Sequence, residues 1–500
     1  MQPPPARRHA GGASCVRTAR SWPAACVSGS CKSGTLRPVP YRTLAGGRYC
    51  GSMGQLRWGT IRGQVARWAR LWANLSRADV LAVLVLLAGV SVRLDWVLDS
   101  RVTPINDAAY YYRHAQELAA GHGYVHPQTG EPSAFLPPGY PILLAAVFAF
   151  TGPSVVAAGL LNVALAAAGL VLVYLIARRM FGAPAGVLAL AAMAFFPSQV
   201  VYTPAVMPDS LLTTLVLGAL YAALAGPPGR VSSVAAGLLL GAAVLTAPKA
   251  ILLLPALPLV WRSGVPWPRS LRATALAGAA MLLVVLPWTI RSSVQLGAPV
   301  FVSTNSGVNL WAGNHEGASG GWEPWDDSTG GWVAPRDEST TDSEFLRSAA
   351  GYAASHPMET IALWPAKLRE AFSQDFSYLG HFSLVPRDRP LDEELDRGEL
   401  EQQVHLYYTM FMVAAVCGAV VLFAARHEGR VLAWPIAALL LPIPIFFGLD
   451  RYHVPLLPIL AIVLAGGMAT AAGTAREALN RFSRSAGGAP EPAGSEAAGR

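Results

Sequence analysis

Charged residues are scarce in this 500-residue chain: they make up 14% of it, against about 25% in soluble domains. Hydrophobic residues make up 53%, and the mean hydropathy is +0.38. Apolar runs of roughly 20 residues, the length that spans a bilayer as a helix, recur along the sequence. These features exclude an ordinary soluble domain and predict an all-α polytopic membrane protein.

Lysine and cysteine are also rare. Only three of the 38 basic residues are lysines, and this bias, with abundant alanine, suggests a GC-rich bacterial coding sequence. Four of the five cysteines fall within the first 50 residues, at spacings that fit no zinc finger. That region is rich in Arg, Pro, Gly and Ser and has no periodicity. We therefore interpret residues 1–75 as a disordered, basic cytoplasmic N-terminus, with Met53 as an alternative start.

Several functional motifs are absent from the sequence. It has no basic patch with interleaved aromatic residues, which excludes the usual nucleic-acid surface, and no G-x-x-x-x-G-K-[ST] phosphate loop. No group of His, Asp or Glu residues has convincing metal-ligand spacing. We therefore predict no nucleic-acid partner and no cofactor, while a divalent metal stays open without a motif to support it.

Arginines at the ends of the apolar segments predict the topology, because cytoplasmic loops are enriched in basic residues. Arginines precede the first segment, so its start is placed in the cytoplasm and the next loop outside. Alternation from there gives about ten spans with both termini cytoplasmic. The stretch 137–152 opens with Pro-Pro and is short for a span, so we interpret it as a juxtamembrane or re-entrant helix. The spans are expected near 78–98, 154–177, 184–202, 209–226, 231–261 (two short segments), 272–290, 405–425, 431–449 and 453–472.

This topology divides the rest of the chain into four regions. An N-terminal membrane core, 76–290, includes a first outer loop at 99–153. An extracytoplasmic loop domain of mixed structure, 291–403, precedes the C-terminal spans at 404–473. The tail, 474–500, is expected to be disordered and cytoplasmic.

Ionisable residues near the span ends collect on the outer side of this topology, whereas the cytoplasmic loops are short and mostly basic. Chemistry is therefore expected outside the membrane, where neither ATP nor nucleotide sugars occur. An enzyme there needs a substrate that is already activated and carried by a lipid, and a polyprenyl-phosphate sugar is such a donor. The outer ionisable residues are Asp107, Glu131, Asp209, Lys249, Arg291, Asp450 and Arg451.

The stretch PINDAAYYYRHAQELAAGHGYV predicts a helix after the first span, with Asn106 as its N-cap and Gly121 as its stop. Asp107, Tyr111 and His114 are spaced so that they share one face of this helix. Two interpretations of Asp107 stay open. It supports the positive end of the helix dipole, or it is a general base that takes a proton from an acceptor hydroxyl.

The other candidates also have two interpretations each. Lys249 breaks a long apolar run after a proline, and it either binds a phosphate or snorkels to the interface. Asp209 begins a span and is either an N-cap or a site residue, while Arg93 either pairs with Asp95 or faces the site. The remaining basic groups are phosphate ligands or interfacial anchors; they are Arg291 and Arg451, with Tyr452 beside the latter.

Three regions, taken in order, resemble bacterial GT-C glycosyltransferases. They are NDAAYYYRHAQELAAGHGYV with GEPSAFLPPGYPILLAAVF, then LPWTIRSSVQLGAPVFVSTNSGVNLWAGNHEGASGGW, and finally RYHVPLLPIL. Within the second, residues 303–322 include Asn314 and either contact sugar hydroxyls or form turns only. The similarity extends over about residues 78–472. It is closest to the branch of the protein O-mannosyltransferases and the lipid A aminoarabinose transferases.

This resemblance implies a multi-span helical core with juxtamembrane helices in the first outer loop. It also implies transfer of a hexose or pentose from a polyprenyl-phosphate donor to an acceptor hydroxyl, usually with inversion. Asp107 would be the catalytic base, and Lys249, Arg291 or Arg451 would hold the lipid phosphate. The aminoarabinose branch has a lysine before the proline of its juxtamembrane turn, where this chain has Phe135-Leu136-Pro137. Lipid A is therefore not implied as the acceptor.

Two other functions stay open. A secondary transporter or lipid flippase is favoured by the break at Pro248–Lys249, although the polar residues gather at one membrane face and no repeat is evident. A non-catalytic scaffold whose outer loop binds partners would not need the acid at Asp107. The expected setting in every case is a bacterial plasma membrane.

Overall fold

A computed structural model describes residues 76–261, 265–325, 337–376, 382–386 and 397–486. These residues belong to one unit of the chain, Trp72–Arg500. The N-terminal region predicted at 1–75 lies outside the described residues.

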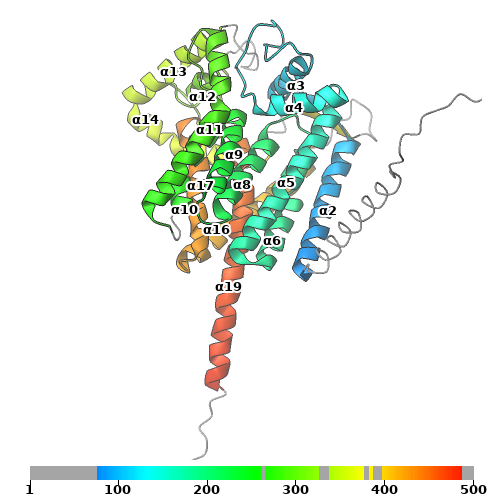
Figure 1. Ribbon diagram of the computed structural model, residues 1–500, viewed down its shortest axis with the longest axis vertical. Coiled ribbons are helices and arrows are strands. Elements are labelled where there is room, and N and C mark those ends of the chain that lie inside the picture. Colours follow the sequence, from blue (N-terminus) through cyan, green and yellow to red (C-terminus); the bar gives the residue numbers. More distant parts are fainter. Residues whose placement is uncertain (1–75, 262–264, 326–336, 377–381, 387–396, 487–500) are drawn as a thin grey trace, which may run out of the picture. The chain divides into compact units, whose positions relative to one another are not determined.

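Helices make up most of the described residues, which confirms the predicted all-α membrane fold (Figure 1). Six segments are long and apolar enough to cross a membrane. They are α2 (Arg77–Asp99), α5 (Val155–Phe181), α11 (Trp267–Leu296), α16 (Arg397–Ala424), the run of η3 (Glu428–Leu432), α17 (Ala433–Leu440) and α18 (Pro442–Ile445), and α19 (Leu457–Ala486).

Five shorter apolar segments complete the bundle. They are α4 (Gly139–Thr151), α6 (Ala183–Ala194), α8 (Asp209–Leu224), α9 (Arg230–Thr246) and the run of η1 (Pro248–Leu253) with α10 (Leu257–Trp261). Which of these cross the membrane is not decided by length and composition, so the count of about ten spans stays a prediction.

Helix starts follow from local chemistry. Ser76 begins α2 with a capping box, in which its hydroxyl accepts from the Asp79 amide and the Asp79 carboxylate accepts from the Ser76 amide. Small residues let the helices approach closely. A Cβ on Gly237 of α9 would lie 2.1 Å from the carbonyl oxygen of Ala277 in α11, so this contact requires glycine, as at other small-residue crossings in membranes.

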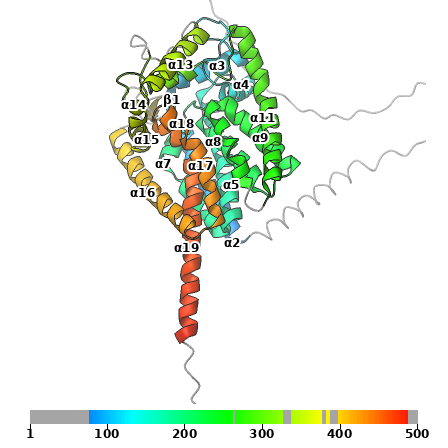
Figure 2. The same ribbon diagram turned by 90° about the vertical axis from the view of Figure 1, so that its left-hand side faces the viewer.

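The described parts of the two loops that were expected to lie outside, 99–153 and 291–403, form one layer at the end of the bundle opposite the C-terminal part of α19 (Figures 1 and 2). In the first loop, β1 (Ser100–Pro104) pairs antiparallel with β2 (Phe382–Pro386) of the long loop. The helix α3 (Asn106–Ala119) packs on α4. The long loop adds α12 (Ser306–Ala312), α13 (Glu338–Ser355), α14 (Pro357–Ala362) and α15 (Trp364–Phe372).

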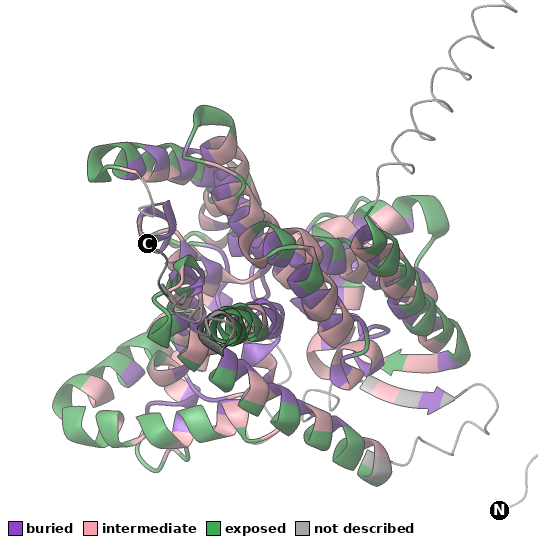
Figure 3. Cartoon of the chain, turned by 90° about the horizontal axis from the view of Figure 1, so that it is seen from below, coloured by how far each residue is buried: buried purple, intermediate pink, exposed green. Residues whose placement is uncertain are grey.

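Apolar side chains also cover the outside of the bundle. Figure 3 shows exposed residues along the outward faces of peripheral helices. Leu84 of α2 is 58% exposed and Met410 of α16 is 65% exposed. Large apolar surfaces of this kind are what lipid covers in a membrane protein. The structure thus agrees with a multi-pass membrane protein.

Three expected boundaries are wrong. Asn106 is the first residue of α3, with a φ of 50°, and Ile105 is the N-cap. The span expected at 184–202 is interrupted after Ala194, because Pro197 cannot continue the hydrogen-bond ladder and begins the short helix α7 (Pro197–Val201). The tail expected to be disordered from 474 is helical as far as Ala486, and residues 487–500 lie outside the described part.

Candidate active site

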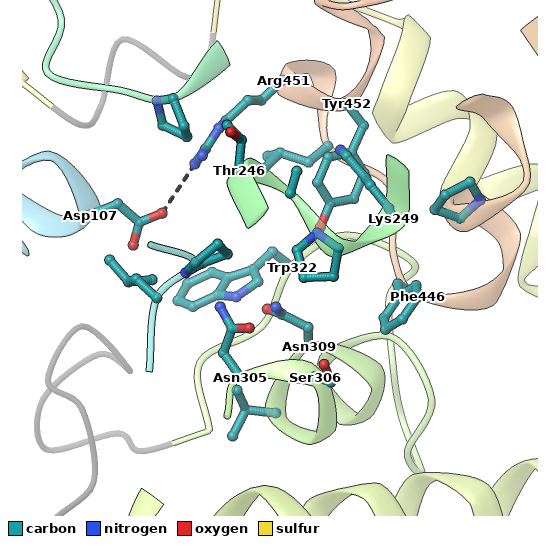
Figure 4. A pocket seen from close by; sticks show the side chains of 18 of the residues that line it. Asp107, Thr246, Lys249, Asn305, Ser306, Asn309, Trp322, Phe446, Arg451 and Tyr452 are labelled. Carbon is teal, nitrogen blue, oxygen red and sulfur yellow. Dashed lines mark hydrogen bonds and ion pairs between the residues drawn. The ribbon is translucent and has the colours of Figure 1, made fainter. Parts of the chain in front are cut away.

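A cavity of about 250 Å³ lies where the first loop meets the end of α9, the long loop and the turn before α19 (Figure 4). Its walls come from segments far apart in the sequence, including α3, the start of α8 and η4 (Asp450–His453). More than half of the predicted site residues meet here. Those in the lining are Asp107, Tyr111, Asp209, Lys249, Arg451 and Tyr452.

Arg451 joins two carboxylates at one side of the cavity. Its Nη1 donates to Asp107 Oδ2 at 3.1 Å, and its Nε donates to Asp209 Oδ2, also at 3.1 Å. The side chain of Asp209 is 7% exposed, whereas that of Asp107 is 31% exposed. Asp107 is therefore the carboxylate with the greater access to the cavity, and its charge is balanced by the guanidinium.

Local structure holds both acids in place. Each lies in the first turn of a helix, α3 or α8, where the dipole stabilises an anion. Tyr202 donates its hydroxyl to Asp209 Oδ2 at 2.8 Å. Asn106, directly before Asp107, adopts a positive φ that few residues other than glycine tolerate. Such backbone conformations concentrate at functional sites.

The charges around these acids fix the protonation of their neighbours. Burial alone would lower the pKa of Arg451, but the carboxylates of Asp209 and Asp107 raise it above its usual value. The guanidinium therefore stays charged. Burial raises the pKa of the Tyr111 phenol, so this side chain faces the acids as a neutral group.

Lys249 lies at the opposite side of the cavity from Asp107 (Figure 4). The helix α9 ends at Thr246, and Pro248 begins the tighter turn η1 that carries the lysine. Its Nζ lies 3.7 Å from the centroid of the Tyr452 ring, within cation–π range. Lys249 forms no ion pair within the part of the chain that the structure describes, so its amino group remains available to an anion from outside.

A third wall of the cavity is polar and aromatic. Asn305 and Asn309 approach it from the start of α12, and Trp322 lies between them and Asp107 in Figure 4. Amides donate and accept hydrogen bonds, and an indole offers an apolar face. Glu338 of α13 braces this wall by accepting from the Thr304 hydroxyl at 2.9 Å. The wall suits a ring that carries hydroxyl groups.

Five predicted site residues lie outside the cavity lining: Arg93, His114, Glu131, Arg291 and Asn314. Arg93 donates to the carbonyls of Met193 and Ala194, and so caps the end of α6 instead of pairing with Asp95. The ring of His114 stacks on Tyr124 with centroids 4.3 Å apart. Burial lowers the pKa of His114 to about 3, so it packs as a neutral ring.

The other three also contact protein groups. The side chain of Glu131 is exposed, away from the cavity. Asn314 donates to the Ile445 carbonyl at 2.8 Å and accepts from Lys367 Nζ at 2.8 Å, and this holds the chain that precedes η4. Arg291 donates to the carbonyls of Ser133 and Tyr124, at 2.7 and 2.6 Å, and so connects the first loop to α11.

The Arg291 contacts lead to a prediction about stability. We expect Arg291→Gln to lower the free energy of unfolding, because each hydrogen bond from a charged group contributes about 1.5–3 kcal/mol. Thermal unfolding in detergent measures the loss. Arg369→Gln is the control, since that side chain is 70% exposed and such surface charges contribute little. If Arg291→Gln instead kept its stability and raised the KM for a polyprenyl-phosphate donor, Arg291 would be a phosphate ligand.

Several lining residues were not predicted individually. Thr246, Trp325 and Phe446 line the cavity beside the charged groups. Asn305, Asn309 and Trp322 belong to the stretch 303–322 that was singled out for sugar contact, although only Asn314 was named in it. Apolar and small polar residues carry no local signal that distinguishes a cavity wall from a core.

The described part of the chain shows no evident set of metal ligands. Among the residues that the structure describes, no group of three or more His, Cys, Asp or Glu side chains is placed to hold a metal ion. Asp107 and Asp209 both contact Arg451, which supplies the positive charge between them.

Known proteins share this architecture. Residues 136–290 match the sequence model of the family described as dolichyl-phosphate-mannose-protein mannosyltransferase, and no curated protein matches the chain. The apo oligosaccharyltransferase of Archaeoglobus fulgidus is 15% identical over 84% of this chain and 53% of its own, with a TM-score of 0.50. The protein has the GT-C fold.

Other solved structures are similar at lower TM-scores. ArnT from Cupriavidus metallidurans, bound to undecaprenyl phosphate, is 18% identical over 82% of this chain and 81% of its own, with a TM-score of 0.38. The chain spans about half the length of the A. fulgidus enzyme, 53% of it. The family match and the shared fold confirm the GT-C resemblance drawn from the sequence.

Proposed function

We propose that this GT-C protein transfers a sugar from a polyprenyl-phosphate donor to an acceptor hydroxyl. The observation that carries the proposal is the arrangement of the cavity. A carboxylate with access to the cavity, Asp107, is held by Arg451 at one side. At the other side lies the amino group of Lys249, which forms no ion pair among the described residues. Transfer from a lipid phosphate needs both groups, one for the incoming hydroxyl and one for the leaving phosphate.

The proposed reaction balances on these groups. The acceptor oxygen attacks the anomeric carbon and its proton passes to Asp107, which acts as general base. The bond between that carbon and the phosphate oxygen breaks with inversion, and polyprenyl phosphate leaves with one more negative charge. Lys249 faces that phosphate and stabilises the added charge. Tyr452 holds the lysine in place through its ring.

We place the cavity on the outer face of a bacterial plasma membrane, with both chain termini in the cytoplasm. Arginine distribution along the sequence supports this sidedness. The partners are then a polyprenyl-phosphate hexose or pentose, membrane lipid and an acceptor hydroxyl on a lipid, glycan or protein. The domain limits proposed from the sequence, with a core at 76–290 and an outer domain at 291–403, follow the same topology.

The phosphate assignment predicts a large kinetic effect at one residue. Lys249→Met should lower kcat/KM for donor consumption by about 10- to 100-fold, because a hydrogen bond to a charged group contributes about 1.5–3 kcal/mol. Membranes that contain the protein and a labelled polyprenyl-phosphate sugar report this as release of polyprenyl phosphate. Lys249→Arg keeps the charge and should retain part of the activity. Equal rates for the methionine variant and the wild type would refute the phosphate role.

A transporter or lipid flippase is the second candidate, and the break between α9 and η1 at Pro248 favours it. Transport moves a lipid-linked sugar across the bilayer without cleaving it. Intact donor that changes leaflet in proteoliposomes, with no release of polyprenyl phosphate, would select this function over transfer.

A further inference from the structure

The four side chains of the turn η4 lie in two different environments. Arg451 and Tyr452 face the cavity. Asp450 and His453 are 1% and 0% exposed and face protein. Asp450 Oδ2 accepts from the amide of Phe376 at 3.0 Å, in the segment that follows α15. The two buried residues therefore fix the orientation in which the other two reach the cavity.

His453 makes the stronger of these attachments. Its Nδ1 lies 2.7 Å from the carbonyl oxygen of Ala371, and its Nε2 lies 2.8 Å from Asp375 Oδ1. Both partners accept, so the ring carries both protons and forms a buried imidazolium–carboxylate pair. The ring also stacks between Phe372 and Tyr408. The pair has no access to the cavity and takes no part in the chemistry proposed above.

Asp375 is tied in turn to the helix that supports the second acid of the cavity. Its Oδ2 accepts from the Ser198 hydroxyl at 2.5 Å, and Ser198 lies in α7. Tyr202 caps the end of the same helix and donates to Asp209, the partner of Arg451. Two chains of hydrogen bonds thus connect η4 to α7. One runs from His453 through Asp375, and the other runs from Arg451 through Asp209.

We propose that Ser198, Asp375 and His453 are positioning residues that set the geometry of Arg451 between the two carboxylates. This inference rests on the proposed transfer reaction, in which Arg451 holds Asp107 in its reactive place. Small displacements of a catalytic group lower the rate steeply. Loss of the hydrogen bonds through His453, Asp375 and Ser198 should therefore reduce turnover. Donor binding at Lys249, which lies on a separate segment, should be retained.

Two matched serine variants test the proposal. Ser198→Ala removes the hydroxyl that holds Asp375, and Ser270→Ala removes an equally buried hydroxyl that donates to the Pro258 carbonyl at 2.8 Å. We expect Ser198→Ala to lower kcat for donor consumption, per folded protein, on the order of 10-fold with little change in KM. The Ser270→Ala control should keep the wild-type kcat. Equal kcat values for both variants and the wild type would overturn the proposal.

The pH profile gives a second readout that a purely structural role would not move. Burial alone would lower the pKa of His453, but Asp375 raises it above its usual value. The other ionisable groups that face the ring are Asp450 and the Tyr408 phenol. In Asp375→Asn the imidazolium loses its main support, so the alkaline limb of kcat should move to lower pH by about one unit or more. An unmoved limb would count against the proposal.

Failure of this inference is distinguishable from failure of the transfer reaction. If the wild type consumes the donor and Ser198→Ala matches it, only the positioning role is lost. If the wild type releases no polyprenyl phosphate from any donor sugar, the proposed reaction is lost, and the positioning role with it.

Discussion

Asp107→Asn should leave the protein folded and lower sugar transfer by about 10²- to 10⁴-fold, the usual contribution of a general base. The amide can still accept one hydrogen bond from Arg451, so the geometry of the cavity is kept. It cannot take a proton from the acceptor hydroxyl. Release of polyprenyl phosphate from a labelled donor, in membranes that hold the natural acceptors, measures the loss.

The neighbouring acid provides the matched control for this variant. Asp209 contacts the same guanidinium but is only 7% exposed, against 31% for Asp107. Asp209→Asn should therefore act through the position of Arg451 and lower the rate less than Asp107→Asn does. Full activity in Asp107→Asn would show that Asp107 is not the general base. Its role would then be to stabilise the start of α3 through the helix dipole.

Arg451→Met should have the second large effect, on stability and rate together. Without the guanidinium, Asp107 and Asp209 face each other as uncompensated charges in a partly buried site. Their repulsion then displaces Asp107 from the position in which it can take the acceptor proton. Removing one partner of a buried pair costs about 3–5 kcal/mol, and we expect a rate loss on the order of 10²- to 10³-fold.

A double-variant cycle separates these two causes. Adding Asp209→Asn to Arg451→Met removes the like-charge repulsion, so part of the lost stability should return, measured by thermal unfolding in detergent. Turnover should stay low, because nothing then orients Asp107. Arg451→Lys keeps a charge but cannot reach both carboxylates in the same planar geometry, so it should resemble the methionine variant in rate. Wild-type turnover in either Arg451 variant would show that the bridge is not needed.

The sequence singled out the candidate site mainly through charges in apolar surroundings. Asp107, Asp209, Lys249 and Arg451 are costly near a membrane, so their presence was itself a signal, and the structure places all four in one cavity. Which charge pairs with which was not accessible, because the partners of Arg451 are more than 200 residues away in the chain. The same reasoning selected Arg291, whose guanidinium instead binds backbone carbonyls of the first loop.

The fold class could be predicted from the sequence more accurately than the boundaries of the helices. Long apolar runs predicted helices such as α2 and α5 within a few residues. The interruption at Pro197 depends on a proline position that a hydropathy pattern smooths over, whereas the break at Pro248 between α9 and η1 was expected from the length of the apolar run. The His453–Asp375 pair gave no signal at all, since a buried histidine in an apolar run is not distinguishable by type from one that only packs.

The most direct test is a structure of the protein in a lipid nanodisc with bound polyprenyl phosphate. The central claim predicts the phosphate group inside the cavity, within hydrogen-bond distance of Lys249 Nζ and across the cavity from Asp107. Lys249→Met should abolish that density under the same conditions. A phosphate bound only outside the cavity, on the lipid-facing surface, would contradict the account.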